Sequence, residues 1–151
     1  MASINVPRVL AGSVAAGAVM IVCDWVINNF ILADAWQRVQ QARNVDVTAA
    51  SGGGELVKFI TVDFLLGFLI VWVYAAIRPR LGPGPGTAVI ATLVIFGAGA
   101  LNTATFAGWM FSWDMFFRST LLGAVSMLAA GLTGARVYTE EEPQAEEQPS
   151  D

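Results

Sequence analysis

The chain has 151 residues, of which 56% are apolar and only 13% are charged. A soluble domain carries about 25% charged residues, so this composition favours lipid rather than water as the surrounding solvent. The formal net charge is −4, but half of the acidic residues follow the last apolar run. The rest of the chain has no basic stripe of the kind that binds nucleic-acid phosphates, which argues against a nucleic-acid-binding protein. One cysteine and no histidine exclude intrachain disulfides, CxxC redox chemistry and histidine-ligated metal or haem sites.

Four long apolar runs predict four membrane-spanning helices, and therefore an all-α, polytopic four-helix transmembrane bundle. They cover about residues 8–33, 56–77, 86–108 and 113–137. A span needs about 20 to 25 residues, and it must be helical because lipid offers no partners for backbone N–H and C=O groups. The first run is too long for the apolar core of a secretory signal, which is about 7 to 15 residues. One domain, 1–138, therefore contains all four spans.

The segments between the spans are short. The sequence Arg78-Pro79-Arg80 is expected to stop the second span, and the glycine- and proline-rich turn 82–86 leads into the third. In the segment 34–54, the spacing of Trp36, Val39 and Arg43 suggests a short interfacial helix, with an irregular loop as the alternative, followed by a flexible linker at 51–54. The segment 139–151 is rich in Glu, Gln and Pro, and we expect this acidic C-terminal tail to be disordered.

The orientation in the membrane has to come from Lys and Arg near the helix ends. The counts on the two sides are equal, but Arg78 and Arg80 lie in a tight turn at a helix end, whereas Arg118 is expected inside the membrane. We therefore expect both termini to be cytoplasmic. This orientation places Trp36, Trp109 and Trp113 at the outer interface as an aromatic belt.

Polar residues occur within the apolar runs, where an ionisable group costs at least ~2.5 to 3.5 kcal/mol near a helix centre. When their distance from the span ends is counted at ~1.5 Å per residue, the polar residues of all four spans lie at a similar depth in the outer half of the membrane. Helical spacing places the side chains on faces shared with small residues, where helices can approach closely. We therefore predict one intramembrane polar cluster, made of Asp24, Asn28, Asp63, Asn102, Asp114 and Arg118.

Two interpretations of this cluster remain open. In the first, Arg118 neutralises one or two carboxylates and the amides complete the hydrogen bonds, so the cluster is purely structural. In the second, three carboxylates outnumber one arginine, so at least one acid stays protonated, carries a proton or meets a cationic ligand. Asp114 is the weaker functional candidate, because an acid in the first turn of a helix is favoured by the helix dipole.

The segment from Val71 to Pro85, with the sequence VWVYAAIRPRLGPGP, and the acid and amide of Asp24 and Asn29 late in the first span resemble features of small, uncharacterised bacterial four-helix membrane proteins. The resemblance implies four helices and a bacterial inner membrane, but no activity. Small multidrug transporters also have four spans and an acid in the first one, without a further motif in common.

The sequence carries no catalytic motif, and we expect no enzymatic activity, no cofactor and no metal site. The favoured hypothesis is a non-enzymatic accessory or scaffold subunit of a larger membrane assembly. The alternative is a small oligomeric transporter or channel in which Asp24 or Asp63 binds a proton or cation. The expected partners are the lipid bilayer and either another membrane protein or further copies of this chain, with no nucleic acid.

Overall fold

The structure is a computed structural model that describes residues 4–44 and 53–138. The described helices are α1 (Val6–Val26), the π-helical η1 (Ile27–Ile31), α2 (Ala33–Arg43), α4 (Gly53–Leu81), α5 (Pro85–Ala104) and α6 (Trp113–Val137). Four stretches are long and apolar enough to cross a membrane: Val6–Ile31, Leu56–Leu81, Pro85–Ala104 and Trp113–Val137. The prediction of an all-α, four-helix membrane bundle is confirmed, and the chain is a multi-pass membrane protein.

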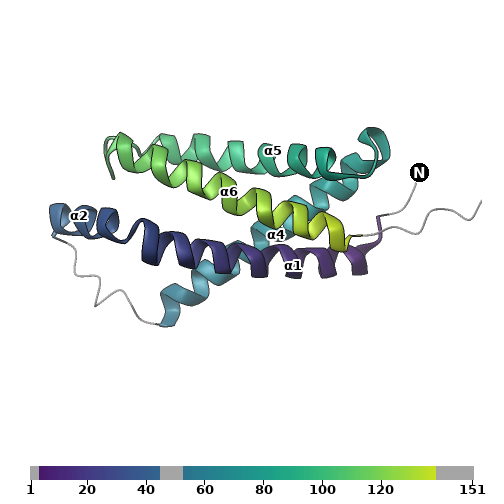
Figure 1. Ribbon diagram of the computed structural model, residues 1–151, viewed down its shortest axis with the longest axis horizontal. Helices are drawn as coiled ribbons and strands as arrows, with labels where there is room; N and C mark the ends of the chain where they lie inside the picture. The colour runs from purple at the N-terminus through teal and green to yellow at the C-terminus, as the bar shows by residue number, and fades with distance from the viewer. Residues whose placement is uncertain (1–3, 45–52, 139–151) are drawn as a thin grey trace, which may run out of the picture.

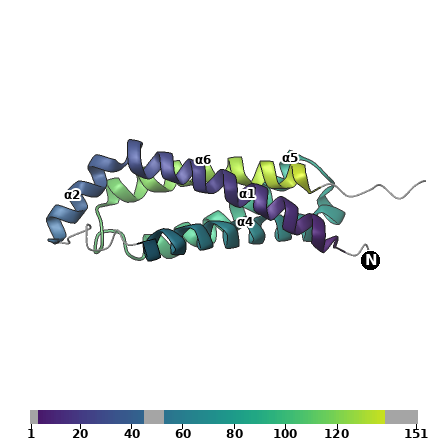
Figure 2. The same ribbon diagram turned by 90° about the horizontal axis from the view of Figure 1, so that it is seen from below.

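The four spanning helices form an antiparallel bundle in which α1 and α5 lie on opposite sides of the α4 and α6 pair (Figures 1 and 2). Both α1 and α5 pack against α4 and α6. The start of α1, the end of α4, the start of α5 and the end of α6 meet at one end, here called the terminal end. The opposite end, here called the α2 end, carries α2 and the loop 105–112.

Small residues bring the helices into close contact. A Cβ atom added to Gly12 of α1 would lie 2.7 Å from the carbonyl oxygen of Gly134 in α6, and one added to Gly67 of α4 would lie 2.9 Å from the nitrogen of Gly17 in α1. Both distances are shorter than any normal contact, so these positions admit only glycine at the present helix separation. Lipid does not drive helices together by the hydrophobic effect, so such close backbone packing stabilises the bundle instead.

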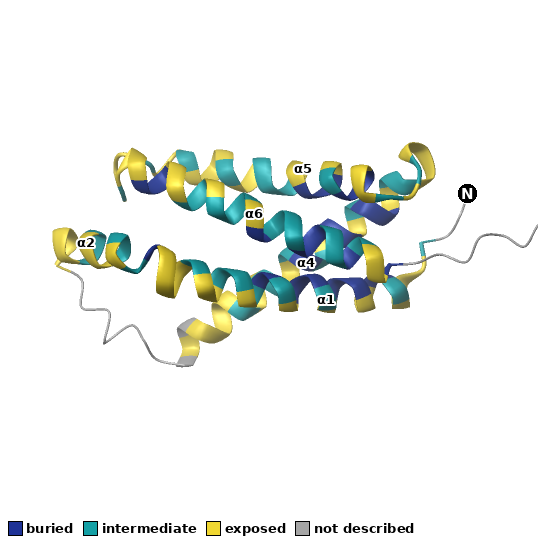
Figure 3. Cartoon of the chain, viewed as in Figure 1, coloured by how far each residue is buried: buried dark blue, intermediate teal, exposed yellow. Residues whose placement is uncertain are grey.

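The buried core lies toward the terminal end, as Figure 3 shows. Its members include Val9 and Ala16 of α1, Ile70 and Val71 of α4, and Ala130 of α6, each at 0% exposure. Toward the α2 end, most side chains of the four helices are exposed on the isolated chain (Figure 3). The two halves of the bundle therefore differ: one is closely packed, and the other leaves much of its helix surface uncovered.

The predicted stop at Arg78-Pro79-Arg80 is wrong, because α4 continues through Pro79 to Leu81. Proline removes only its own N–H and disturbs the carbonyl four residues earlier, and later residues can still donate to carbonyls of the preceding turn. The Gly82 N–H donates to the Arg78 carbonyl at 2.9 Å. The helix ends there because Gly82 adopts a φ of +84°, which favours glycine at the C-terminal end of a helix.

The third span is shorter than predicted, since α5 ends at Ala104 rather than near residue 108. Turns follow, and the Gly108 N–H donates to the Phe111 carbonyl at 2.8 Å with a φ of +81° at Gly108. The Ser112 hydroxyl then caps α6 by accepting a hydrogen bond from the Met115 N–H. Hydropathy placed the end of the span too late because residues 106–111 are apolar, although they belong to a folded loop between the two helices.

Residues 33–43 form the helix predicted there, rather than the irregular loop. Its N-terminus follows η1 directly, and its C-terminus ends at Asn44, which adopts the left-handed conformation with a φ of 54°. Of the predicted linker 51–54, the last two residues belong to α4. The first two lie outside the described residues, as does the predicted acidic tail 139–151.

Candidate intramembrane polar site

Asp24 of α1 lies against α6 and accepts a hydrogen bond there. The Ser126 hydroxyl donates to Asp24 Oδ1 at 2.6 Å. Ser126 is buried at 1% exposure, whereas Asp24 is half-buried. At ~1.5 Å per residue, Asp24 lies about 10 Å inside the Ile31 end of its span. The site is therefore a carboxylate within the membrane-spanning region, held by a hydroxyl of a neighbouring helix.

Asp63 of α4 is the second carboxylate of this site. It is also half-buried. Its position is about 10 Å inside the Leu56 end of its span, so the two acids are at the predicted similar depth. Within residues 4–44 and 53–138, Asp63 has neither a hydrogen bond nor an ion pair. Of these two acids, only Asp24 has a hydrogen-bond donor among the described residues.

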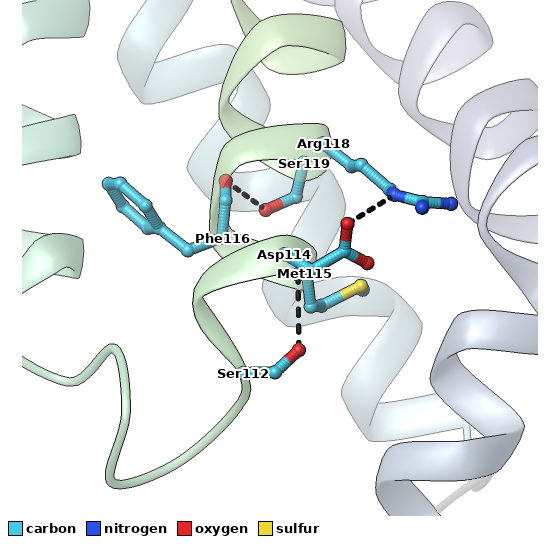
Figure 4. A network of polar contacts seen from close by, with 6 residues as sticks. All are labelled: Ser112, Asp114, Met115, Phe116, Arg118 and Ser119. Carbon is cyan, nitrogen blue, oxygen red and sulfur yellow. Dashed lines mark hydrogen bonds and ion pairs between the residues drawn. The ribbon is translucent and has the colours of Figure 1, made fainter.

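Arg118 does not join the two carboxylates, so the predicted cluster is wrong at this residue. Its Nε donates to Asp114 Oδ1 at 2.9 Å within the first turns of α6, and both side chains are exposed, at 61% and 68% respectively (Figure 4). The packing of α1 on α6 sets Ser126 opposite Asp24, and Arg118 lies about 12 Å farther along α6 toward the α2 end. An arginine side chain cannot cover that distance, so Asp114 and Arg118 form a separate ion pair.

Asn28 does not point into the bundle interior as predicted, but stabilises the bend between α1 and α2. In η1 the Leu32 N–H donates to the Ile27 carbonyl, five residues back. This shift leaves carbonyls of the preceding turn short of donors. The side-chain amides of Asn28 and Asn29 donate to the carbonyls of Asp24 and Trp25 at 2.8 and 2.9 Å. Trp36 Nε1 also donates to Asn28 Oδ1 at 2.8 Å, so Asn28 joins η1 to α2.

Asn102 is also absent from the carboxylate site. It is exposed, and it lies only about 3 Å from the end of α5 at Ala104. The prediction placed it deeper because the third span was drawn too long. Asn102 is therefore near the membrane interface, where its backbone carbonyl accepts from the Thr105 hydroxyl at 2.7 Å.

Ser126 is the site residue that sequence reasoning missed. It belongs to a row of small residues four positions apart, Ser126, Ala130 and Gly134, and all three are buried. A row of small residues at this spacing is the usual signal for a close helix contact in membranes. Ser13 and Gly17 of α1, which are four residues apart, are buried in the same way.

Two cavities lie at the ends of the bundle, and neither is lined by Asp24 or Asp63. One of about 390 Å³ lies at the α2 end, between α2 and the start of α6, with Arg38, Arg43, Asp114 and Arg118 in its wall. Arg43 donates to the Trp109 carbonyl there, which ties α2 to the loop 105–112. The other, of about 670 Å³, lies at the terminal end. The two carboxylates thus lie between these cavities, on partly covered helix faces.

In the described part of the chain, no group of three or more Cys, Asp or Glu residues could hold a metal ion. No family model, curated protein or solved structure matches the chain.

Proposed function

We propose that this chain is a non-enzymatic accessory or scaffold subunit of a larger membrane assembly, and that partner helices cover the α2 half of its bundle. The observation that carries the proposal is Asp63, a half-exposed carboxylate about 10 Å inside its span. An ionisable side chain at such a depth almost always faces a bundle interior or a water-filled cavity, because contact with lipid is costly.

The described part of this chain gives Asp63 no hydrogen-bonding or charged partner. Neither of the two cavities is lined by this carboxylate. A polar or basic group on another helix would complete the site, since polar groups hydrogen-bond across helix interfaces in membranes. A second copy of this chain and a different membrane protein both fit this requirement.

Site-specific photocrosslinking in native membranes tests this proposal. A photoreactive residue at Phe59, one turn from Asp63 on the same face and 67% exposed, should give a discrete crosslinked product. Val14, which lies in the terminal half of α1 and is 59% exposed, is the matched control and should give lipid adducts only. The product mass distinguishes a second copy from a different protein. Adducts of lipid alone at both positions would contradict the proposal.

A second candidate function, a small oligomeric transporter or channel, is favoured by the similar depth of Asp24 and Asp63 within their spans. A carboxylate within a membrane span can bind a proton or a cation. In that case several copies would enclose an aqueous path that passes both residues.

The proposal includes a location. We place the chain in a bacterial inner membrane with both termini in the cytoplasm, in keeping with the resemblance to small bacterial membrane proteins and with the arginines of the terminal end.

A further inference from the structure

The cavity of about 670 Å³ at the terminal end is lined by residues of α4, α5 and α6 that include both basic and apolar side chains. Arg78 of α4 and Arg136 of α6 give it positive charge, and Tyr74 and Tyr138 add aromatic rings. Ala88, Ala129 and Leu132 form an apolar wall in the same cavity. One side therefore suits an anion, and the other suits a hydrocarbon chain.

The basic side of the cavity is held in place by packing. The Tyr74 and Tyr138 rings meet edge to face with centroids 5.9 Å apart, and both residues are buried, at 3% and 2% exposure. The Arg78 guanidinium carbon lies 5.9 Å from the centroid of the Tyr138 ring, an arrangement that favours a cation over the ring face. The Tyr74 hydroxyl accepts from the Gly84 N–H at 3.3 Å, so the turn before α5 is fixed to the same cluster.

Arginines gather around the cavity. Arg8, Arg78, Arg80 and Arg136 all lie at helix ends on this side of the bundle. The cavity also opens beside the start of α5, where the helix dipole favours negative charge. An anion at this place meets guanidinium groups and a helix N-terminus together.

We propose that this cavity binds an anionic phospholipid, with the headgroup phosphate between Arg78 and Arg136 and the upper acyl chain against Ala88, Ala129 and Leu132. The guanidinium groups donate charge-assisted hydrogen bonds to the phosphate. Basic pockets between transmembrane helices at a membrane surface recognise anionic headgroups in this way. The apolar wall favours a lipid over free phosphate, because inorganic phosphate has no group to place there.

Native mass spectrometry of the full chain tests the proposal, with phosphatidylglycerol and phosphatidylcholine added in equal amounts to the detergent-purified protein. We expect phosphatidylglycerol to be retained at least tenfold more than phosphatidylcholine. Arg78→Gln and Arg136→Gln should each lower its retention by about tenfold, the size of one lost charge-assisted hydrogen bond. The matched control is Arg80→Gln, which removes an arginine of the same helix end that does not line the cavity.

A second variant separates the cavity from general charge. Ala129→Phe should narrow the cavity and lower phosphatidylglycerol retention while every arginine remains. Equal losses in Arg78→Gln and Arg80→Gln, or unchanged retention in Ala129→Phe, would overturn the proposal, because both results indicate non-specific attraction to the surface. Displacement of the lipid by millimolar inorganic phosphate would likewise show that the cavity recognises phosphate alone.

The chain has its own anions close by, since Glu140, Glu141 and Glu142 follow Tyr138 within four residues. The full-length triple variant with Gln at these three positions addresses this competitor. Similar phosphatidylglycerol selectivity in the triple variant and the unmodified chain supports the lipid site. Selectivity that appears only in the triple variant would assign the cavity to the tail and overturn the proposal.

Discussion

At the scale of single residues, Asp24 and Asp63 are the side chains on which the two candidate functions disagree. Transport predicts that Asp24→Asn and Asp63→Asn each abolish proton or cation flux into proteoliposomes, because an amide keeps the shape of the side chain but cannot exchange a proton. Flux is measured with a pH-sensitive dye and with a tracer cation. Asp34→Asn is the control, since Asp34 is exposed on α2 outside the spans.

Flux that persists in both variants would remove the carboxylates from any transport mechanism. If the unmodified chain also gives no flux above empty liposomes, the subunit function is favoured. Asp24→Asn can still accept a hydrogen bond from Ser126 through its amide oxygen, so the contact between α1 and α6 should survive this substitution. Loss of flux together with loss of folding would therefore count against the transport argument.

Sequence reasoning located the carboxylates correctly but not their partners. The depth of Asp24 and Asp63 follows from the edges of two apolar runs, and those edges are close to the observed ones. The partner of Asp24 depends on the register between α1 and α6, which close packing at Gly12 and Gly134 determines. Hydropathy contains no information about that register, so the sequence suggests Arg118 as a partner for the carboxylates but gives no sign of Ser126.

At the scale of an element, the π-helical segment η1 determines how α2 leaves α1, and Asn28 is the residue that connects them. Asn28→Ala removes the hydrogen bonds to Trp36 Nε1 and to the Asp24 carbonyl. Each such bond is worth about 0.5 to 1.5 kcal/mol. We expect α2 to open more often, so that trypsin cleaves after Arg38 and Arg43 about tenfold faster in the purified protein.

Asn29→Ala serves as the control for this experiment. It removes only the bond to the Trp25 carbonyl and leaves the contact with Trp36 intact. Cleavage should then change little. Equal acceleration in both variants would mean that η1 itself, and not the connection through Asn28, holds α2.

Helix ends show which local signals can be read from sequence. The start of α6 at Trp113 was predicted, and Ser112 is a favourable N-cap residue there. The end of α5 was not predicted, because the turns at 105–111 are as apolar as the span before them. The amino-acid composition does not predict the π-helical turn at Ile27–Ile31. The two adjacent asparagines in it nevertheless fit a turn in which side-chain amides donate hydrogen bonds to backbone carbonyls.

At the scale of the whole molecule, the bundle is packed at the terminal end and open toward the α2 end. The core residues of α1, α4 and α5 come mainly from the turns nearest the terminal end. The large exposed side chains near the α2 end include Phe30, Phe59 and Leu101. This asymmetry agrees with a subunit whose own fold is stabilised at one end, while the other end is completed by contact with a partner.

The basic residues of the two ends are equal in number but differ in position, and their position predicts the orientation in the membrane. All four arginines of the terminal end lie at helix ends, whereas Arg118, at the other end, is paired with Asp114. Because basic residues near span ends are retained in the cytoplasm, a fluorescent protein fused after residue 151 should fluoresce in bacterial cells, and alkaline phosphatase fused there should be inactive.

The double variant Arg78→Gln, Arg80→Gln removes the basic residues of the turn between α4 and α5. It should produce a mixed population with measurable phosphatase activity, because the α2 end then has more Lys and Arg residues than the terminal end, which favours the opposite orientation. An active phosphatase in the unmodified chain would reverse the orientation and place the terminal-end cavity against the outer leaflet.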